Sequence, residues 1–310
     1  MRVSVFAVVH LQFRHNMRSY RFVQLDVFTS RPLEGNQLAV FPDASSLSDT
    51  EMQALAREMN LSETTFILPR EGAIEARDGV KVRIFTVAEE LPFAGHPTLG
   101  TAYAIRSSRS DHPALVTLDL KVGKIPVEFS ERAEGVFGEM RQRDAEFGAT
   151  FPREEVARAM GIPAGELADE WPIQAVSTGV PFAMVPFRRL ETLRSLSFSF
   201  AQAADYLERS GAKFLYFICP QRARDSLTVE ARMIFYNGED PATGSAAGCC
   251  AAWMVRYGLA QPGEPVLIEQ GAAIRRPSQI YVRACRNGDS IIDVRVGGHC
   301  VEVLRGEINL

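Results

Sequence analysis

Two short stretches of the chain place a polar side chain directly before proline. They read HPTLGTAYA from His96 and DPATGSAAG from Asp240, and they share the order polar residue, proline, two residues, glycine, hydroxyl residue, alanine. A polar side chain in this position can accept hydrogen bonds from the free N–H groups of a first helical turn, and proline fits the first helical position. Each stretch therefore predicts a helix, capped by His96 in the first and by Asp240 in the second. The alternative to a true repeat is a chance match between two ordinary helix starts.

The predicted helix starts are suited to binding an anion. The free N–H groups and the dipole of a helix favour negative charge at its N-terminus, and small residues let a ligand approach the backbone. The two stretches lie 144 residues apart. This spacing indicates two similar halves that face one cleft.

Glu63, the carboxylate of the LSETTF stretch, is a candidate acid or base. A side chain that moves a proton between carbon atoms needs both protonation states near pH 7 and a site that keeps water away. Glu63 lies between Leu61 and Phe66, and an apolar cleft there would raise its pKa. From the residues alone, an ordinary surface or capping glutamate is the simpler interpretation, and both stay open.

The composition indicates a large globular protein of balanced charge. The chain has 310 residues, 46% of them hydrophobic, so we expect a sizeable core and two domains. Its 34 basic and 38 acidic residues give a net charge of −4, which offers no basic surface for nucleic acid. The five cysteines include no CxxC pair, and no apolar run is long enough to span a bilayer. We expect a reduced, cytoplasmic protein with no metal cluster, no nucleic-acid partner and no membrane contact.

Residues 1–19 are expected to form an N-terminal extension outside the fold. They contain a seven-residue apolar run that resembles part of a signal peptide, but the run is short and no small-residue cleavage site follows it. A strand pattern begins at Tyr20, directly after this extension. A targeting segment is the alternative.

The residues around these stretches predict the elements that position them. Residues 20–43 predict a β-hairpin with its bend near Gly35 and Asn36, and Ser48 predicts the start of a helix. Strands follow, and then a central helix over 97–106. Neighbouring strands with few crossover helices favour an α+β unit in which a curved, mostly antiparallel sheet wraps around the central helix.

The second half repeats this order of elements. Its central helix, over 243–258, is apolar on nearly all sides, which is typical of a buried helix. We therefore expect an α+β fold of two pseudo-symmetric domains, each a curved, mostly antiparallel sheet or barrel around a central helix. The expected domains span residues 20–122 and 123–297. The residues alone do not decide which half the last strand, 298–310, joins.

Four motifs resemble one known family. They are MNLSETTFIL at 59–68, ELPFAGHPTLGTA at 90–102, EDPATGSAAG at 239–248 and the weaker IEQGAAIRRPSQIYVRA at 268–284. On these motifs the chain resembles the phenazine-biosynthesis PhzF family, which has the diaminopimelate epimerase-like fold. The resemblance implies an active site between two domains and a C-terminal strand that returns to the first domain. One departure is Gln37, which stands where the family usually has proline.

The resemblance also implies the roles of individual residues. The glutamate that matches Glu63 is the general acid/base of the family, and His96 and Asp240 line the pocket and help to move or steady the proton. The residues implied to bind the substrate carboxylate are Ser62, Gly95, Gly244 and Ser245.

The implied reaction is an isomerisation without a cofactor or metal. Glu63 removes a proton from one ring carbon of an acid like trans-2,3-dihydro-3-hydroxyanthranilate and returns it at another, which shifts a double bond and gives an enol that becomes a ketone. The implied partners are a small carboxylic acid and a second copy of the chain in a homodimer.

Other functions stay open or are disfavoured. An isomerase or epimerase of another small acid is an alternative, and so is a non-catalytic small-molecule-binding protein on the same fold. Relatives that epimerise amino acids carry a cysteine at each helix start, where this chain has Ala94 and the Asp240 segment, so a two-thiol racemase is disfavoured. The chain lacks the glycine fingerprint of a nucleotide-dependent oxidoreductase and the G-x-S-x-G motif of a serine hydrolase.

Overall fold

The computed structural model describes residues 17–223, 226–235 and 238–310. Most of the expected N-terminal extension, residues 1–16, lies outside the described residues. Of the remainder, Ser19 begins the first strand, and Arg18 exchanges backbone hydrogen bonds with Leu310. None of the described helices is both long and apolar enough to cross a membrane.

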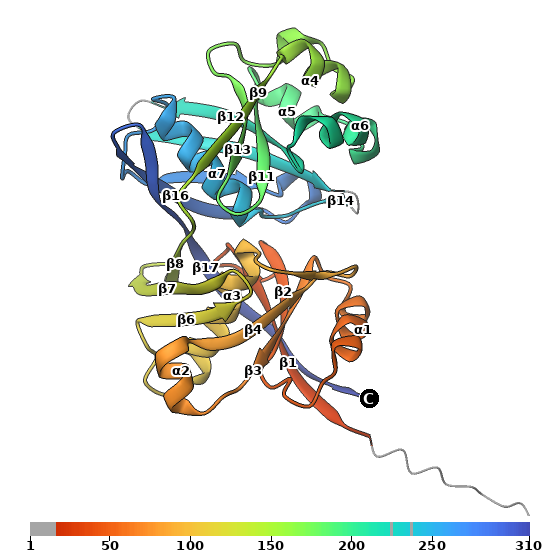
Figure 1. The fold of residues 1–310 in the computed structure, drawn as a ribbon, viewed down its shortest axis with the longest axis vertical. Helices are drawn as coiled ribbons and strands as arrows, with labels where there is room; N and C mark the ends of the chain where they lie inside the picture. The colour runs from red at the N-terminus through yellow and green to blue at the C-terminus, as the bar shows by residue number, and fades with distance from the viewer. Residues whose placement is uncertain (1–16, 224–225, 236–237) are drawn as a thin grey trace, which may run out of the picture.

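The described residues form a mixed α+β fold (Figure 1). The helices are α1 (Asp49–Met59), α2 (Gly72–Asp78), α3 (Gly95–Ser108), α4 (Arg153–Met160), α5 (Leu190–Ser195), α6 (Phe200–Ser210) and α7 (Gly244–Arg256), with 3-10 turns η1 (Ala164–Glu166) and η2 (Ala272–Ile274). The strands are β1 (Ser19–Val27), β2 (Asn36–Phe41), β3 (Glu63–Leu68), β4 (Val80–Phe85), β5 (Glu90–Leu91), β6 (Leu115–Leu120), β7 (Gly123–Arg132), β8 (Gly135–Arg141), β9 (Glu146–Phe151), β10 (Ile173–Ser177), β11 (Pro181–Pro186), β12 (Phe214–Ala223), β13 (Ser226–Phe235), β14 (Gly238–Glu239), β15 (Val266–Gln270), β16 (Ser278–Asn287) and β17 (Ser290–Asn309).

The first half is a closed barrel, the lower body in Figure 1. The strands β1, β2, β3, β4, β6, β7 and β8 pair in that order, and β17 pairs with both β8 and β1. Helix α3 packs against strands of this barrel, and it buries Leu99, Ala102 and Ile105 in the same core as Leu25 and Leu38. The expected curved sheet around a central helix is thus confirmed.

The second half repeats the strand order of the first. Both halves show the same series of six strand pairs, in the order antiparallel, parallel, antiparallel, parallel, antiparallel, antiparallel. The pairs are β10–β11, β11–β12, β12–β13, β13–β15, β15–β16 and β16–β17 in the second half and β1–β2, β2–β3, β3–β4, β4–β6, β6–β7 and β7–β8 in the first. Helix α7 occupies the place of α3 and buries Cys250, Trp253 and Met254. The repeated motif in the sequence therefore corresponds to a repeated architecture.

Strand β17 belongs to both halves. Its first part pairs with β16, and residues Cys300–Asn309 pair with β1. A separate last strand over 298–310 was expected, but the strand begins at Ser290 and continues through Gly297 and Gly298 without a break. Both glycines sit against bulky partners, because an added β-carbon would lie 2.7 Å from the Phe137 ring and 2.6 Å from the Phe28 ring, respectively.

The boundary between the halves is best drawn after β8. The expected boundary, between residues 122 and 123, falls between β6 and β7, which are antiparallel neighbours in the first barrel. We propose that the first unit runs to Arg141 and takes in the C-terminal part of β17.

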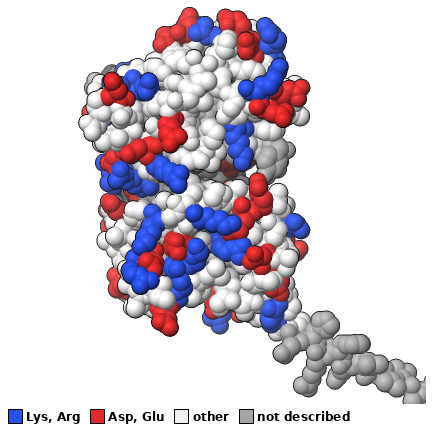
Figure 2. All heavy atoms as spheres, in the orientation of Figure 1, with Lys and Arg blue, Asp and Glu red and all other residues white. Residues whose placement is uncertain are grey.

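Figure 2 shows that Lys and Arg side chains are interspersed with Asp and Glu side chains on the visible face of both bodies.

Candidate active site

The N-terminal ends of α3 and α7 touch each other. A β-carbon added at Gly95 would lie 2.9 Å from the Gly244 backbone and 2.9 Å from the Ser245 nitrogen. In any α-helix the first four N–H groups lack intrahelical partners. The contact therefore brings two sets of free N–H groups together, which is the anion-binding arrangement predicted from the two stretches.

The predicted caps of these helices are wrong. The N-cap of α3 is Ala94, so His96 lies inside the first turn, and the N-cap of α7 is Thr243, three residues after Asp240. Pro97 is tolerated inside the first turn of α3 because that turn leaves its N–H groups free in any case. Before α7, side-chain hydrogen bonds hold the chain at Asp240 and Ala242 in a non-helical path, so the helix begins later.

Glu63 and His96 face each other across the site. Glu63 is the first residue of β3, and its Oε2 lies 3.5 Å from Nε2 of His96 in the first turn of α3. The Glu63 side chain is 15% exposed and that of His96 is 5% exposed. Among the described residues neither of these two atoms has a hydrogen-bond partner. Burial of two polar atoms without hydrogen-bond partners destabilises the folded protein. Such a pair indicates a place where a bound ligand supplies the missing hydrogen bonds.

Burial shifts the pKa of both groups toward their neutral forms. Removal from water raises the pKa of Glu63 to about 8, and the nearby charge of Asp240 adds to this effect. Removal from water lowers the pKa of His96 to about 3, against a smaller opposing effect of a hydrogen bond with the Gln37 backbone. At neutral pH, Glu63 is therefore largely protonated and His96 is neutral.

Asp240 is the second carboxyl of the site and is held from several sides. Asn36 Nδ2 donates to its Oδ1 at 2.8 Å, Thr243 Oγ1 donates to its Oδ2 at 2.7 Å, and Gln270 Nε2 donates to its backbone oxygen at 2.8 Å. Burial raises the pKa of Asp240 to about 7, although hydrogen bonds from Thr243, Asn36 and Ser62 oppose that shift. Two carboxyls with raised pKa values in one site are typical of acid–base chemistry.

The structure brings all the predicted site residues into one region. Ser62 precedes Glu63 and donates to Asp240, and Gly95, Gly244 and Ser245 form the contact between the two helix starts. Sequence reasoning missed three supporting residues that surround Asp240. They are Asn36, Thr243 and Gln270. For Asn36 the only signal was its place next to Gly35 in the predicted bend.

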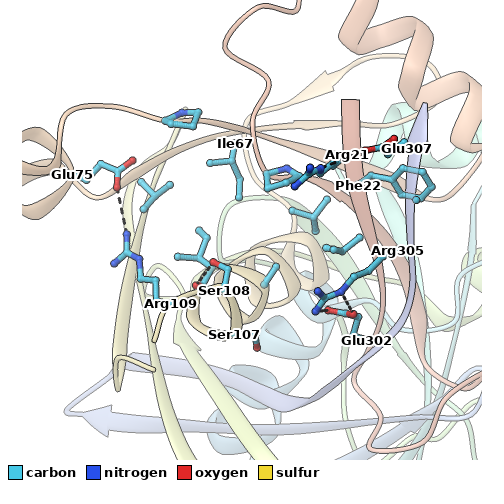
Figure 3. A pocket seen from close by; sticks show the side chains of 18 residues that line it. Arg21, Phe22, Ile67, Glu75, Ser107, Ser108, Arg109, Glu302, Arg305 and Glu307 are labelled. Carbon is cyan, nitrogen blue, oxygen red and sulfur yellow. Dashed lines mark hydrogen bonds and ion pairs between the residues drawn. The ribbon is translucent and has the colours of Figure 1, made fainter. Parts of the chain in front are cut away.

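A cavity of about 1000 Å³ lies elsewhere in the first barrel (Figure 3). It lies at the C-terminal end of α3, about 20 Å along this 14-residue helix from His96. Its walls are mostly apolar, and its three arginines are paired, Arg21 with Glu307, Arg109 with Glu75 and Arg305 with Glu302. It is lined by none of the predicted site residues. Within the described part of the chain no group of three or more His, Cys, Asp or Glu side chains could hold a metal ion.

A family model and a curated relative both match most of the chain. The PhzC-PhzF family model, described as phenazine biosynthesis-like protein, matches residues 25–306. The trans-2,3-dihydro-3-hydroxyanthranilate isomerase of Pseudomonas chlororaphis is 36% identical over 297 residues, which are 94% of this chain and 100% of that protein.

Solved structures agree in fold. A predicted epimerase from Pseudomonas aeruginosa is 38% identical, with a TM-score of 0.79 over 93% of this chain and 99% of its own. A PhzF-family phenazine biosynthesis protein from Bacillus anthracis is 25% identical, with a TM-score of 0.83 over 94% of this chain and 99% of its own.

Proposed function

The chain belongs to the PhzC-PhzF family of phenazine biosynthesis-like proteins, and from that premise we propose which reaction its site performs. Its relatives from Pseudomonas chlororaphis and Pseudomonas fluorescens are named isomerases, and the chain is an isomerase. The Pseudomonas chlororaphis relative is named as an isomerase of trans-2,3-dihydro-3-hydroxyanthranilate. We propose that this chain moves a proton between two carbons of a small cyclic carboxylic acid. The observation that carries the proposal is the buried pair of Glu63 Oε2 and His96 Nε2, which lie 3.5 Å apart and have no hydrogen-bond partner among the described residues.

Glu63 is the group that transfers the proton. A carboxyl with a pKa of about 8 can give a proton to carbon as an acid and take one from carbon as a base near neutral pH. Because the Glu63 side chain is largely buried, it can take a proton from one carbon and return a proton to another while the substrate stays bound. A double bond then shifts, and the resulting enol becomes a ketone, so that no atom is gained or lost.

His96 assists Glu63 as a neutral group. Its pKa of about 3 means that it carries no charge at neutral pH and does not stabilise ionised Glu63 through an ion pair. At 3.5 Å its Nε2 can still form a hydrogen bond with Glu63 after a small movement. His96 thereby orients the carboxyl toward the substrate.

The substrate carboxylate binds at the contact between α3 and α7. The free N–H groups of both first turns, near Gly95 and Gly244, converge there, and Ser62 and Ser245 add hydroxyl groups. This contact holds the ring beside Glu63. The reaction needs no cofactor on this route, and we further propose a cytoplasmic homodimer.

Epimerisation of another small acid is the second candidate. The site contains two carboxyls with raised pKa values, Glu63 and Asp240, and an epimerase uses one group on each face of the carbon. A similar solved protein is described as a predicted epimerase. The two candidates differ in where the proton returns, at a new carbon or at the same carbon with inversion.

Proton exchange in heavy water tests the proposal. Small cyclic carboxylic acids, including trans-2,3-dihydro-3-hydroxyanthranilate, are incubated with the protein and followed by NMR, with Glu63→Gln as the control. We expect deuterium at a ring carbon only with the wild-type protein. Inversion at a single carbon would favour the epimerase, and binding without exchange in either protein would refute both candidates.

A further inference from the structure

Asn36 connects the two halves of the protein inside the site. It is the first residue of β2 in the first barrel and is 1% exposed. Its Nδ2 donates to Asp240 Oδ1 at 2.8 Å and to the Ala242 backbone oxygen at 2.9 Å, both on the segment that leads into α7. The amide nitrogen has two hydrogens, and these two acceptors take both of them.

Asn36 also lies beside the catalytic pair. Its Nδ2 is 3.3 Å from Nδ1 of His96, whose other ring nitrogen faces Glu63. The same side chain therefore contacts the histidine of the first helix start and the carboxyl ahead of the second.

The backbone next to Asn36 is hydrogen-bonded to residues of the second half. The N–H of Gly35 donates to the Pro277 oxygen at 2.9 Å, and Arg276 Nε donates to the Gly35 oxygen at 3.0 Å. Arg276 also pairs with the buried carboxylate of Asp26 at 2.6 Å. Gly35 has a φ of 69°, and an added β-carbon would lie 2.4 Å from the Val27 oxygen, so this tight path requires glycine.

We propose that Asn36 is a positioning residue for proton transfer, which fixes Asp240 and the start of α7 against His96 and thereby sets the geometry of the site. This inference rests on the proposed function for its catalytic consequence. The structural part of the inference does not depend on the substrate, because the Asn36 amide donates its hydrogen bond to the Asp240 carboxylate in the free protein.

The test replaces Asn36 with Leu, which keeps the branched shape of the side chain but donates no hydrogen bond. Asp240 then loses a donor to its ionised form, so its pKa rises. The carboxyl signals of the free protein, labelled with ¹³C in aspartate, are titrated by NMR, and Asp240→Asn identifies the signal. The other titratable or polar groups that act on this carboxyl are Glu63, Glu239, Tyr216, Ser62 and Thr243, and the His96 ring lies beside Asn36.

Gln174→Met is the matched control. Gln174 is another buried amide, which donates to the Gly148 oxygen at 2.9 Å and accepts from the Tyr257 hydroxyl, and it lies on β10 away from the helix contact. The replacement of Gln174 removes buried hydrogen bonds, as the replacement of Asn36 does, but these bonds lie outside the site. Asn36→Ala serves as the second variant in case Asn36→Leu does not fold.

The outcomes separate this inference from the proposed function. We expect the Asp240 titration to move to higher pH in the Asn36 variants and not in Gln174→Met. With a substrate that exchanges, we expect kcat to fall about 10²-fold in the Asn36 variants with a smaller change in KM. An unmoved Asp240 titration, or an equal shift in the control, would overturn the positioning role. Absence of exchange in the wild-type protein would refute the proposed function alone, because the titration still decides the role of Asn36.

Discussion

Glu63 and His96 approach to 3.5 Å as two neutral groups rather than as an ion pair. The pKa of Glu63 is about 8 and that of His96 is about 3, so over the range between these values the carboxyl holds its proton and the imidazole holds no charge. Burial is the largest cause of both shifts. At neutral pH Glu63 is therefore mainly in its acid form, and its ionised form becomes abundant as the pH rises to about 8.

The first prediction concerns the pH dependence of catalysis. Removal of a substrate proton requires ionised Glu63, and this form becomes more abundant as the pH rises through about 8. We therefore expect kcat/KM of the wild-type protein to increase about tenfold per pH unit below that value and to level off above it. Because Asp240 titrates at about 7 beside Glu63, the measured constants belong to the two carboxyls together. Initial exchange rates between pH 5.5 and 9.5 measure the profile, and a flat profile contradicts this role of Glu63.

The second prediction concerns the pH dependence of stability. The folded protein keeps the Glu63 proton up to about pH 8, whereas the unfolded chain releases it near the ordinary value of 4.5. Stability therefore falls as the pH rises from 4.5 through 8. Between pH 6 and 9 we expect Glu63 to contribute a loss of about 2 to 3 kcal/mol in the free energy of unfolding. This contribution is absent in Glu63→Gln.

Urea denaturation at pH 6 and pH 9 measures this difference. Glu58→Gln is the control, because Glu58 is an exposed glutamate on α1 that lies outside the site. The control should keep the wild-type dependence on pH. Equal losses in the wild-type protein and in Glu63→Gln would mean that Glu63 is not buried in its neutral form.

The third prediction concerns the contact between the helix starts. In Gly95→Ala the new β-carbon would lie 2.9 Å from the backbone of Gly244, so α3 and α7 must separate. The N–H groups that hold the substrate carboxylate then no longer converge, and we expect KM to rise about 10- to 100-fold. Gly72→Ala on α2 is the control, because no atom lies within 4 Å of its added β-carbon. Equal KM values in both variants would place the carboxylate elsewhere.

Local features of the fold could be predicted from the sequence. Ser48 caps α1 through a capping box with Glu51, and this signal lies within four residues of the chain. The repeated stretches at His96 and Asp240 predicted two equivalent central helices, because the motif and the architecture repeat together. The apolar surface of α7 likewise predicted its burial.

Contacts between distant segments could not be predicted in the same way. Asp240 was expected to cap α7, but hydrogen bonds from Asn36 and Gln270, 204 and 30 residues away, hold it outside the helix. Asn36 itself was seen only as part of a bend, since its partners become neighbours through the meeting of two barrels. Local patterns carry no record of such partners, so the supporting residues of the site emerge only from the fold.

The last prediction concerns Asp240→Asn and distinguishes the two candidate reactions. Asp240 contributes to the raised pKa of Glu63 through its charge, while burial contributes more. Removal of that charge lowers the pKa of Glu63 part of the way, so the rising limb of the kcat/KM profile should move to lower pH. If Asp240 only tunes Glu63, the variant keeps proton exchange, with kcat reduced about tenfold or less. If Asp240 is the second acid/base of an epimerase, exchange falls by 10² to 10⁴, as expected for the loss of a general acid or base.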